Sequence, residues 1–163
     1  MQMAILLALS SLALSAQTIS VGQLNLWDPE PVKTLAQLWG EAAQNPKSAA
    51  ARVQVSYALL NQNRLRQAEW TARESMELDR ANAQAQLSLG WTLAREYRYT
   101  EEALECLRHA SAAYPAAHLG AADVLAHQGS LAEARAELRA YLASGDKDYL
   151  RPAENWLRLL GDK

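Results

Sequence analysis

Cys106 and His109 are the residues of this sequence that most readily suggest chemistry, because a thiol and an imidazole can hold a metal or act as nucleophile and base. They stand three positions apart, so they share one face of any helix that contains both. A structural zinc site, however, usually takes four ligands, and the chain has one Cys and three His. We therefore expect neither a metal site nor a reactive thiol here.

Other chemistry-bearing patterns are weak. The sequence contains no GxGxxG, no P-loop, no HExxH and no GxSxG motif. The acids Glu101 and Glu102, like Asp146 and Asp148, come at the starts of predicted helices, where the helix dipole favours negative charge. We expect no catalytic residue and no cofactor; an enzyme of unrecognised type remains an alternative.

The charge pattern bears on possible partners. The net charge is −2 and the pI is about 5.9, with Lys and Arg scattered along the chain. A nucleic-acid-binding surface needs a basic stripe. We therefore expect no nucleic-acid partner.

The N-terminal segment differs from the rest, because the first charged residue is Asp28. Residues 3–14 form a nearly unbroken apolar run, shorter than the roughly 20 residues of a spanning helix, and small residues follow it. We predict a secretory signal over residues 1–16 and an exported protein that is periplasmic, secreted or part of the cell envelope. An uncleaved membrane anchor, the only expected membrane contact, and a buried N-terminal helix remain alternatives.

Beyond a linker at residues 17–31, the apolar pattern is helical throughout. Asp28 is the expected N-cap of a first helix, over residues 32–44, whose apolar residues recur every three or four positions until Pro46 ends it. Further apolar stripes alternate with short polar turns, and no convincing strand pattern appears. The predicted fold class is all-α.

Three segments of this helical region repeat one pattern. Each places a bulky residue shortly before a small one, and another core residue follows one helix turn later: Leu65, Ala68 and Ala72; Tyr99, Ala103 and Leu107; Leu131, Ala134 and Leu138. In this register Ala103, Leu107 and Ala110 are buried. Cys106 then lies beside the buried stripe as a small hydrophobe, and His109 faces solvent.

This pattern, with Leu89-Gly90 before the second segment and Pro115 after it, resembles the tetratricopeptide repeat family over about residues 47–145. The resemblance implies a right-handed α-solenoid of stacked helix-turn-helix units in a domain over residues 32–145, closed by a capping helix within 146–163. The small residues are 35 and then 31 positions apart, which indicates one extra residue in the turn EYRYT and a shorter join after Pro115. A plain helical bundle remains an alternative.

The resemblance also implies a concave groove lined by the first helix of each unit. The groove positions carried over to this sequence are Val53, Tyr57, Asn61, Leu87, Trp91, Arg95, Leu119, Asp123 and His127. We expect Trp91 to offer an aromatic platform and Arg95 to pair with a carboxylate of the ligand. The alternative for Trp91 is that it packs between neighbouring units.

The function expected from these features is a non-enzymatic scaffold that binds a peptide segment or a partner protein in this groove. The alternative within the same class is a membrane-tethered assembly or chaperone subunit. The sequence does not identify the partner.

Overall fold

The computed structural model describes residues 33–161, and these residues form eight helices and no strand. The helices are α2 (Leu35–Gln44), α3 (Ala49–Asn61), α4 (Leu65–Leu78), α5 (Ala83–Arg95), α6 (Glu101–Ser111), α7 (Ala117–His127), α8 (Leu131–Ala143) and α9 (Leu150–Leu159). The all-α prediction is therefore confirmed. The predicted signal and linker lie outside the described residues.

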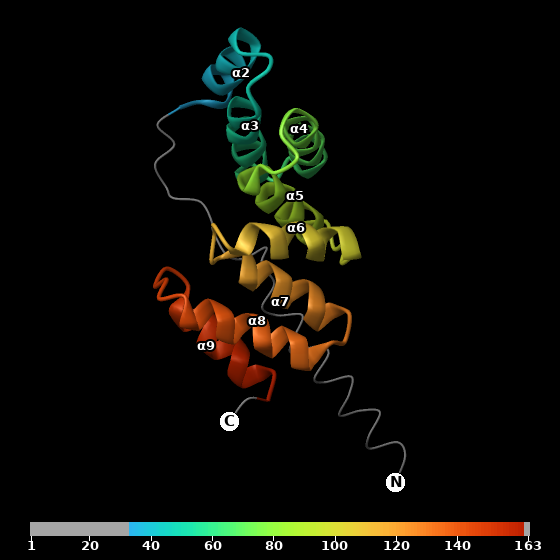
Figure 1. Ribbon diagram of the computed structural model, residues 1–163, viewed down its shortest axis with the longest axis vertical. Coiled ribbons are helices and arrows are strands. Elements are labelled where there is room, and N and C mark those ends of the chain that lie inside the picture. Colours follow the sequence, from blue (N-terminus) through green and yellow to red (C-terminus); the bar gives the residue numbers. More distant parts are fainter. Residues whose placement is uncertain (1–32, 162–163) are drawn as a thin grey trace.

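The helices pack in the order in which they follow one another in the chain. Three antiparallel pairs, α3–α4, α5–α6 and α7–α8, have the closest contacts, and α2 and α9 pack against the two ends of this stack. Figure 1 shows the succession from α2 at the top to α8 and α9 at the bottom. In addition, α5 contacts α3 and α7, so the first helices of the pairs form a row of their own.

Local signals explain where four of the eight described helices begin. Thr34, Ser48, Asn82 and Thr100 are N-caps whose side chains accept hydrogen bonds from backbone N–H groups of the first turn. Thr34 forms a complete capping box with Gln37, so α2 begins at Leu35. The predicted start at residue 32, with Asp28 as N-cap, lies outside the described residues, and the capping box places the start of α2 at Leu35. Its end is as predicted: α2 stops just before Asn45 and Pro46.

The first helix of each pair ends in the same way. Asn63, Tyr97 and Gly129 have positive φ angles of 57°, 58° and 83°. The backbone N–H of the next residue donates a 2.9 Å hydrogen bond back into the helix in each case. The bonds run from Arg64 to the Leu59 carbonyl, from Arg98 to the Leu93 carbonyl and from Ser130 to the Leu125 carbonyl. This left-handed turn reverses the chain and starts the second helix. The turn after α5 is longer than the other two, since five residues separate α5 from α6, as the extra residue in EYRYT predicts.

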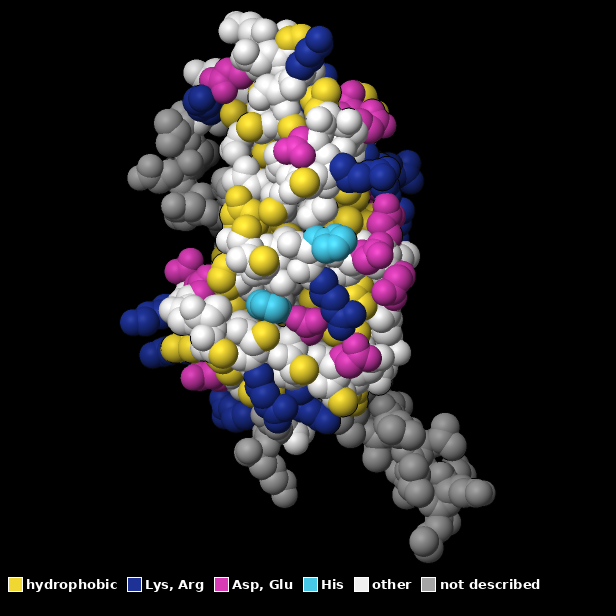
Figure 2. All heavy atoms as spheres, in the orientation of Figure 1, with side chains coloured by type: hydrophobic (Ala, Val, Ile, Leu, Met, Phe, Trp, Pro, Cys, Tyr) yellow, Lys and Arg dark blue, Asp and Glu magenta, His cyan; other side chains and the backbone are white. Residues whose placement is uncertain are grey.

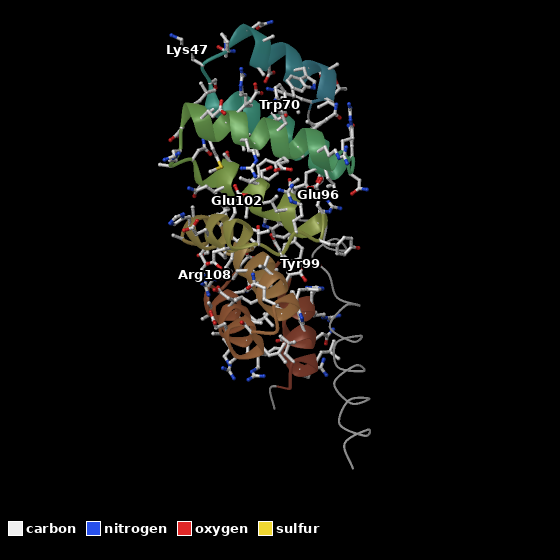
Figure 3. All side chains as sticks on the ribbon, turned by 90° about the vertical axis from the view of Figure 1, so that its right-hand side faces the viewer. Lys47, Trp70, Glu96, Tyr99, Glu102 and Arg108 are labelled. Atoms are coloured by element: carbon white, nitrogen blue, oxygen red, sulfur yellow. The ribbon has the colours of Figure 1, made fainter. Side chains whose placement is uncertain are left out.

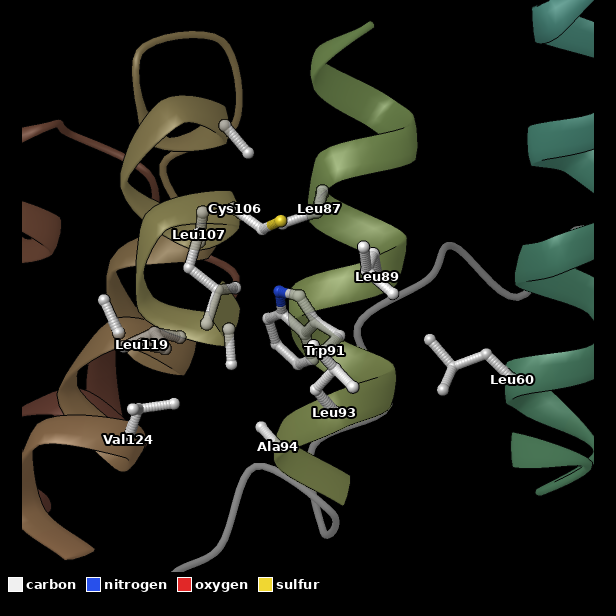
Figure 4. Packing of buried hydrophobic residues seen from close by; sticks show 14 of the residues in the cluster. Leu60, Leu87, Leu89, Trp91, Leu93, Ala94, Cys106, Leu107, Leu119 and Val124 are labelled. Atoms are coloured by element: carbon white, nitrogen blue, oxygen red, sulfur yellow. The ribbon is translucent and has the colours of Figure 1, made fainter. Parts of the chain in front are cut away.

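The small residues of the repeated pattern lie where paired helices touch. Ala68, Ala103 and Ala134 are fully buried, as predicted. The tightest crossing is at Leu107 of α6: a Cβ added to Gly90 of α5 would come 2.6 Å from Leu107 Cγ, and one added to Gly120 of α7 would come 2.8 Å from Leu107 Cδ2. Figure 4 shows Leu107 on α6 beside the buried side chains of α5 and α7. Glycine allows these helices to approach one another.

The C-terminal helix α9 closes the stack as predicted. Ala153, Trp156 and Leu160 are buried against α8, and Gly161, with a φ of 83°, follows the helix end. None of the helices in residues 33–161 is long and apolar enough to cross a membrane.

Candidate functional site

The predicted groove residues separate into two groups by burial. Six of them are buried: Val53, Tyr57, Leu87, Trp91, Leu119 and Asp123. The other three, Asn61, Arg95 and His127, are exposed or half-buried and stand in the last turns of α3, α5 and α7. We call these three residues the terminal row.

Trp91 is 3% exposed, so the expectation that it faces solvent as a platform is wrong. The reason is the position of α5, which has α3, α4, α6 and α7 packed around it. Its indole Nε1 is buried and has no hydrogen-bond partner. Trp91 therefore packs between the pairs, as the alternative interpretation expects, and the binding role of the other positions stays a prediction.

Tyr57 holds the equivalent place in α3, 34 positions earlier, and its hydroxyl does find a partner. It donates a 2.9 Å hydrogen bond to the carbonyl of Gln84 in α5. Burial raises the pKa of this hydroxyl far above its usual value, so it stays protonated as a donor. Tyr57 thus joins the first pair to the second.

Arg95 also bridges these pairs. Its Nη1 donates a 3.0 Å hydrogen bond to the carbonyl of Leu60, near the C-terminal end of α3. Partial burial lowers the pKa of the guanidinium, but arginine keeps its proton.

His127 belongs to a cluster at the end of α7. Its Nδ1 lies 2.9 Å from the carbonyl oxygen of Asp123 and 3.2 Å from the Asp123 carboxylate, which is 1% exposed. Tyr99 stacks on the imidazole, with ring centroids 3.9 Å apart and an angle of 6° between the planes. The hydrogen bond to the Asp123 carboxylate raises the pKa of His127, which favours a cationic ring at this position.

Sequence reasoning missed Tyr97 and Tyr99 as surface-forming residues. Tyr97 is 73% exposed and keeps a left-handed backbone, where the equivalent positions carry Asn63 and Gly129. The ring of Tyr97 meets that of Tyr99 edge to face, with centroids 6.2 Å apart. The extra residue in EYRYT was the available signal, because a longer turn can extend over the neighbouring helix.

A second set of charged residues links the second helices of the pairs. Arg73 of α4 binds both carboxylate oxygens of Glu102 in α6, at 2.6 and 2.9 Å, and Arg98 binds Glu69 at 2.6 Å. Arg108 of α6 binds Glu133 and Glu137 of α8, each at 3.0 Å. In Figure 3, Glu102 and Arg108 lie toward one edge of the molecule and Glu96 and Tyr99 toward the other. We call these ion pairs of Arg73, Arg98 and Arg108 the ion-pair ladder. They do not include a residue of the terminal row, and each of these arginines is paired with a carboxylate.

The Cys106–His109 pair is not brought together. Cys106 is buried, and burial raises the pKa of its thiol to about 11, which disfavours the reactive thiolate. His109 faces solvent, as predicted. Within residues 33–161 no group of three or more His, Cys, Asp or Glu side chains could hold a metal ion.

The chain was also compared with known proteins. No protein-family model matches it, and no curated protein matches it as a relative. Chemically, the terminal row offers an amide, a guanidinium and an imidazole, which are groups that donate hydrogen bonds to carbonyl and carboxylate oxygens.

Proposed function

We propose that this protein is a non-enzymatic scaffold of the tetratricopeptide-repeat kind, a right-handed α-solenoid that binds a peptide segment of a partner protein. The observation that carries the proposal is the terminal row, in which Asn61, Arg95 and His127 take corresponding places in α3, α5 and α7. Repeated helix ends that present polar groups in line suit an extended ligand that spans several units.

The terminal row favours a peptide with oxygen acceptors. An extended backbone offers a carbonyl at each residue, and a carboxylate would pair with Arg95 in bidentate fashion. His127, whose pKa the Asp123 carboxylate raises, adds an imidazole at the far end of the row. The exposed ring of Tyr97, which follows Arg95 after one residue, gives the peptide an aromatic surface next to these donors.

Binding can be tested with a triple variant, Asn61→Ala, Arg95→Ala and His127→Ala. Partners captured from the envelope fraction by the unaltered chain are quantified by mass spectrometry, and the affinity of the strongest is then titrated. We expect at least about tenfold weaker binding, equal to about 1.4 kcal/mol. Raising the salt concentration should reduce the part of this loss due to Arg95, because salt screens a charge that is only partly buried.

The matched control is Glu77→Ala, Glu105→Ala and His109→Ala, which alters three exposed side chains of the second helices. Circular dichroism must show both variants to be as helical as the unaltered chain. A partner that binds the terminal-row variant normally but is lost by the control would refute the proposal and assign binding to the second helices.

We propose further that the protein is exported and that the apolar run over residues 3–14 is removed with its flanking residues. The run and the small residues after it have the composition of a signal segment. Intact-mass measurement of the protein from its native host should show a species that begins near Ala16 or Gln17. A full-length species that requires detergent would favour the membrane-tethered alternative instead.

A further inference from the structure

The turn that joins α5 to α6 contacts the end of α7 through Tyr99. The ring of Tyr99 stacks on the imidazole of His127, with centroids 3.9 Å apart and 6° between the planes. The carbonyl of Tyr99 accepts a 3.0 Å hydrogen bond from Nε2 of Gln128, the residue after His127. The side chain and the backbone of one turn residue are therefore both attached to the same helix end. Figure 2 shows the face of the stack that Figure 1 presents, and Figure 3 labels Tyr99 at the edge where this turn lies.

The imidazole of His127 is itself attached to Asp123, one turn earlier in α7. Its Nδ1 lies 3.2 Å from Oδ1 of the carboxylate, which is 1% exposed. Burial removes most of the water that would screen this carboxylate, so a cationic partner contributes more here than at the surface. Asp123, His127 and Tyr99 thus form a chain of contacts from the interior of α7 to the turn.

Both contacts of the imidazole depend on its proton. With both ring nitrogens protonated, His127 forms an ion pair with Asp123, and the face of Tyr99 lies against a cation, which an aromatic ring attracts at this distance. Without the second proton, the ion pair is lost, and so is the attraction between the tyrosine face and a cation. Hydrogen bonding to Asp123 raises the pKa of His127 above its ordinary value of 6.5, against the effect of burial.

The elements packed against α7 bring further titratable and charged groups. Within residues 33–161, Asp123 is the one charged group that bonds His127. The other groups at the adjoining ends of α5, α6 and α8 and in the turn are exposed or have partners of their own: Tyr97 and Glu101 are exposed, Arg95 bonds the Leu60 carbonyl, Glu96 bonds Arg98, Glu102 bonds Arg73, and Glu133 bonds Arg108. Burial raises the pKa of the Tyr99 hydroxyl, so the stacked ring stays neutral while His127 titrates.

We propose that Asp123, His127 and Tyr99 form a pH latch, which holds the turn between α5 and α6 against α7 while His127 is cationic and releases it when His127 becomes neutral. His127 binds its proton more tightly in the closed latch than in the open one. The stabilisation is therefore fully present below about pH 6.5 and is lost as the pH rises through the pKa of His127 in the closed latch. Release frees the ring of Tyr99, and the ring of Tyr97 that contacts it edge to face moves with the turn.

The first test measures the proton affinity of His127. In the full chain, NMR titration follows the signals of the three imidazoles, which the changes His109→Gln, His118→Gln and His127→Gln assign. We expect the pKa of His127 to lie above 6.5 and the change Asp123→Asn to lower it. A His127 pKa at or below 6.5 would overturn the proposal.

The second test measures the turn. Hydrogen exchange with mass spectrometry follows residues 96–100 of the full chain at about pH 6 and about pH 8, and the rates are corrected for the intrinsic effect of pH. The amides of Tyr97 and Arg98, which bond carbonyls of α5, should lose protection about threefold or more at the higher pH. The readout is local because His118, which contacts Glu137, adds its own pH dependence to the stability of the whole chain.

Variants connect the exchange of the turn to the latch. His127→Gln should give the same protection at both pH values. The matched control is His109→Gln, which alters an exposed imidazole of α6 and should keep the pH dependence of the unaltered chain. Tyr99→Phe retains the stacked ring and should keep this dependence as well, whereas Tyr99→Leu removes the stack and should reduce it.

Two results of the exchange measurement would overturn the proposal: a pH dependence that persists in His127→Gln, and equal behaviour of Tyr99→Leu and Tyr99→Phe. Circular dichroism must show that each variant is as helical as the unaltered chain. Asp123 is buried, so if Asp123→Asn does not fold, the variants of His127 and Tyr99 decide the outcome. No partner takes part in either measurement, so failure of the pH latch leaves the peptide-binding proposal untouched.

Discussion

The two junctions between the three helix pairs are built differently. At the first junction, between α3–α4 and α5–α6, hydrogen bonds join the pairs. The hydroxyl oxygens of Ser56 in α3 and Ser88 in α5 are 2.6 Å apart, and Ser56 also donates to the carbonyl of Ala68 at 2.8 Å. Tyr57 and Arg95 add the bonds to Gln84 and Leu60 described above.

At the second junction, between α5–α6 and α7–α8, Gln128 Nε2 donates a 3.0 Å hydrogen bond to the carbonyl of Tyr99, and the buried contact between the pairs relies on shape. Leu107 fills the space that Gly90 and Gly120 leave between α5, α6 and α7. Buried polar atoms at this junction lack partners: neither the Trp91 Nε1 nor the Tyr99 hydroxyl has one. Gly90 stands 34 positions after Ser56, so at corresponding places the first unit has a hydroxyl that bonds to the next pair and the second has a close approach to the second helix of its own pair.

The difference teaches that one repeated pattern can be stabilised by two kinds of interaction. Removal of a hydroxyl that bonds across a junction leaves a buried polar group without its partner. A methyl group added to a glycine that packs against a leucine creates a clash. The four predictions below test this difference, beginning with the largest expected effect.

Gly90→Ala should destabilise the protein by about 1–3 kcal/mol, because the new methyl group meets Leu107 and the backbone of Ala103. The measurement is the free energy of unfolding in urea. Gly40→Ala in α2 is the control: nothing lies within 4 Å of the added Cβ, so the better helix propensity of alanine should stabilise by up to about 1 kcal/mol.

A Leu107→Ala background sharpens this test. With the leucine shortened, Gly90→Ala should cost less than it does in the unaltered chain, because contacting residues are not additive. If Gly90→Ala stabilises the protein as Gly40→Ala does, the crossing of α5 and α6 at Leu107 is not closely packed.

Ser56→Ala should cost about 1–2 kcal/mol, since it leaves the Ser88 hydroxyl and the Ala68 carbonyl without this partner in a buried place. Chemical denaturation measures the loss. Changing Ser56 and Ser88 together to alanine should cost less than the sum of the two single changes, because no hydroxyl is then left unpaired. Strict additivity would show that the two hydroxyl groups do not interact.

Two tyrosines allow a comparison without change of ring size. Tyr57→Phe at the first junction should lose about 1 kcal/mol, because the bond to the Gln84 carbonyl disappears. Tyr99→Phe should be neutral or slightly stabilising, because the hydroxyl it removes is buried without a partner. Equal losses from the two changes, measured as unfolding midpoints, would contradict the contrast between the junctions.

The ion-pair ladder crosses both junctions and should matter least. Arg73→Ala should cost under about 1 kcal/mol near neutral pH, since the Arg73–Glu102 pair is largely exposed. The hydrogen bond from Arg73 lowers the pKa of Glu102 below its ordinary value of 4.5. A lowered folded-state pKa gives stability that is present above this value and is lost as the pH falls.

The unfolding midpoint of the unaltered chain should therefore fall between about pH 6 and about pH 3 by more than that of Arg73→Ala. The same slope in both proteins would show that this pair contributes nothing to acid sensitivity. Burial raises the pKa of Glu69, but Arg98 and Arg73 together lower it. Because Arg98 remains in the variant, part of the acid sensitivity of Glu69 remains in both proteins.

Much of the fold followed from the period of the apolar residues. The buried positions of Ala68, Ala103 and Ala134 and the longer turn before α6 were predictable, because each depends on a pattern within one helix pair. The start of α2 was not predictable in this way, because the sequence offers two N-terminal signals, Asp28 and the capping box of Thr34.

The candidate site was less predictable, because it depends on which helices become neighbours. The burial of Trp91 follows from the four helices around α5. The pairs Arg73–Glu102 and Arg98–Glu69 join residues 29 positions apart. Nothing in the local sequence shows that these side chains meet, and the stacking of Tyr99 on His127 has the same cause.

The succession of helices also has a kinetic consequence. Within residues 33–161, all substantial contacts join helices that are neighbours or next neighbours in the chain. Few long loops must close before such contacts form, so the chain should fold quickly for its length. Opening can then begin at a terminal helix while the central pair stays intact, and backbone amides of α2 and α9 should exchange with solvent before those of α5.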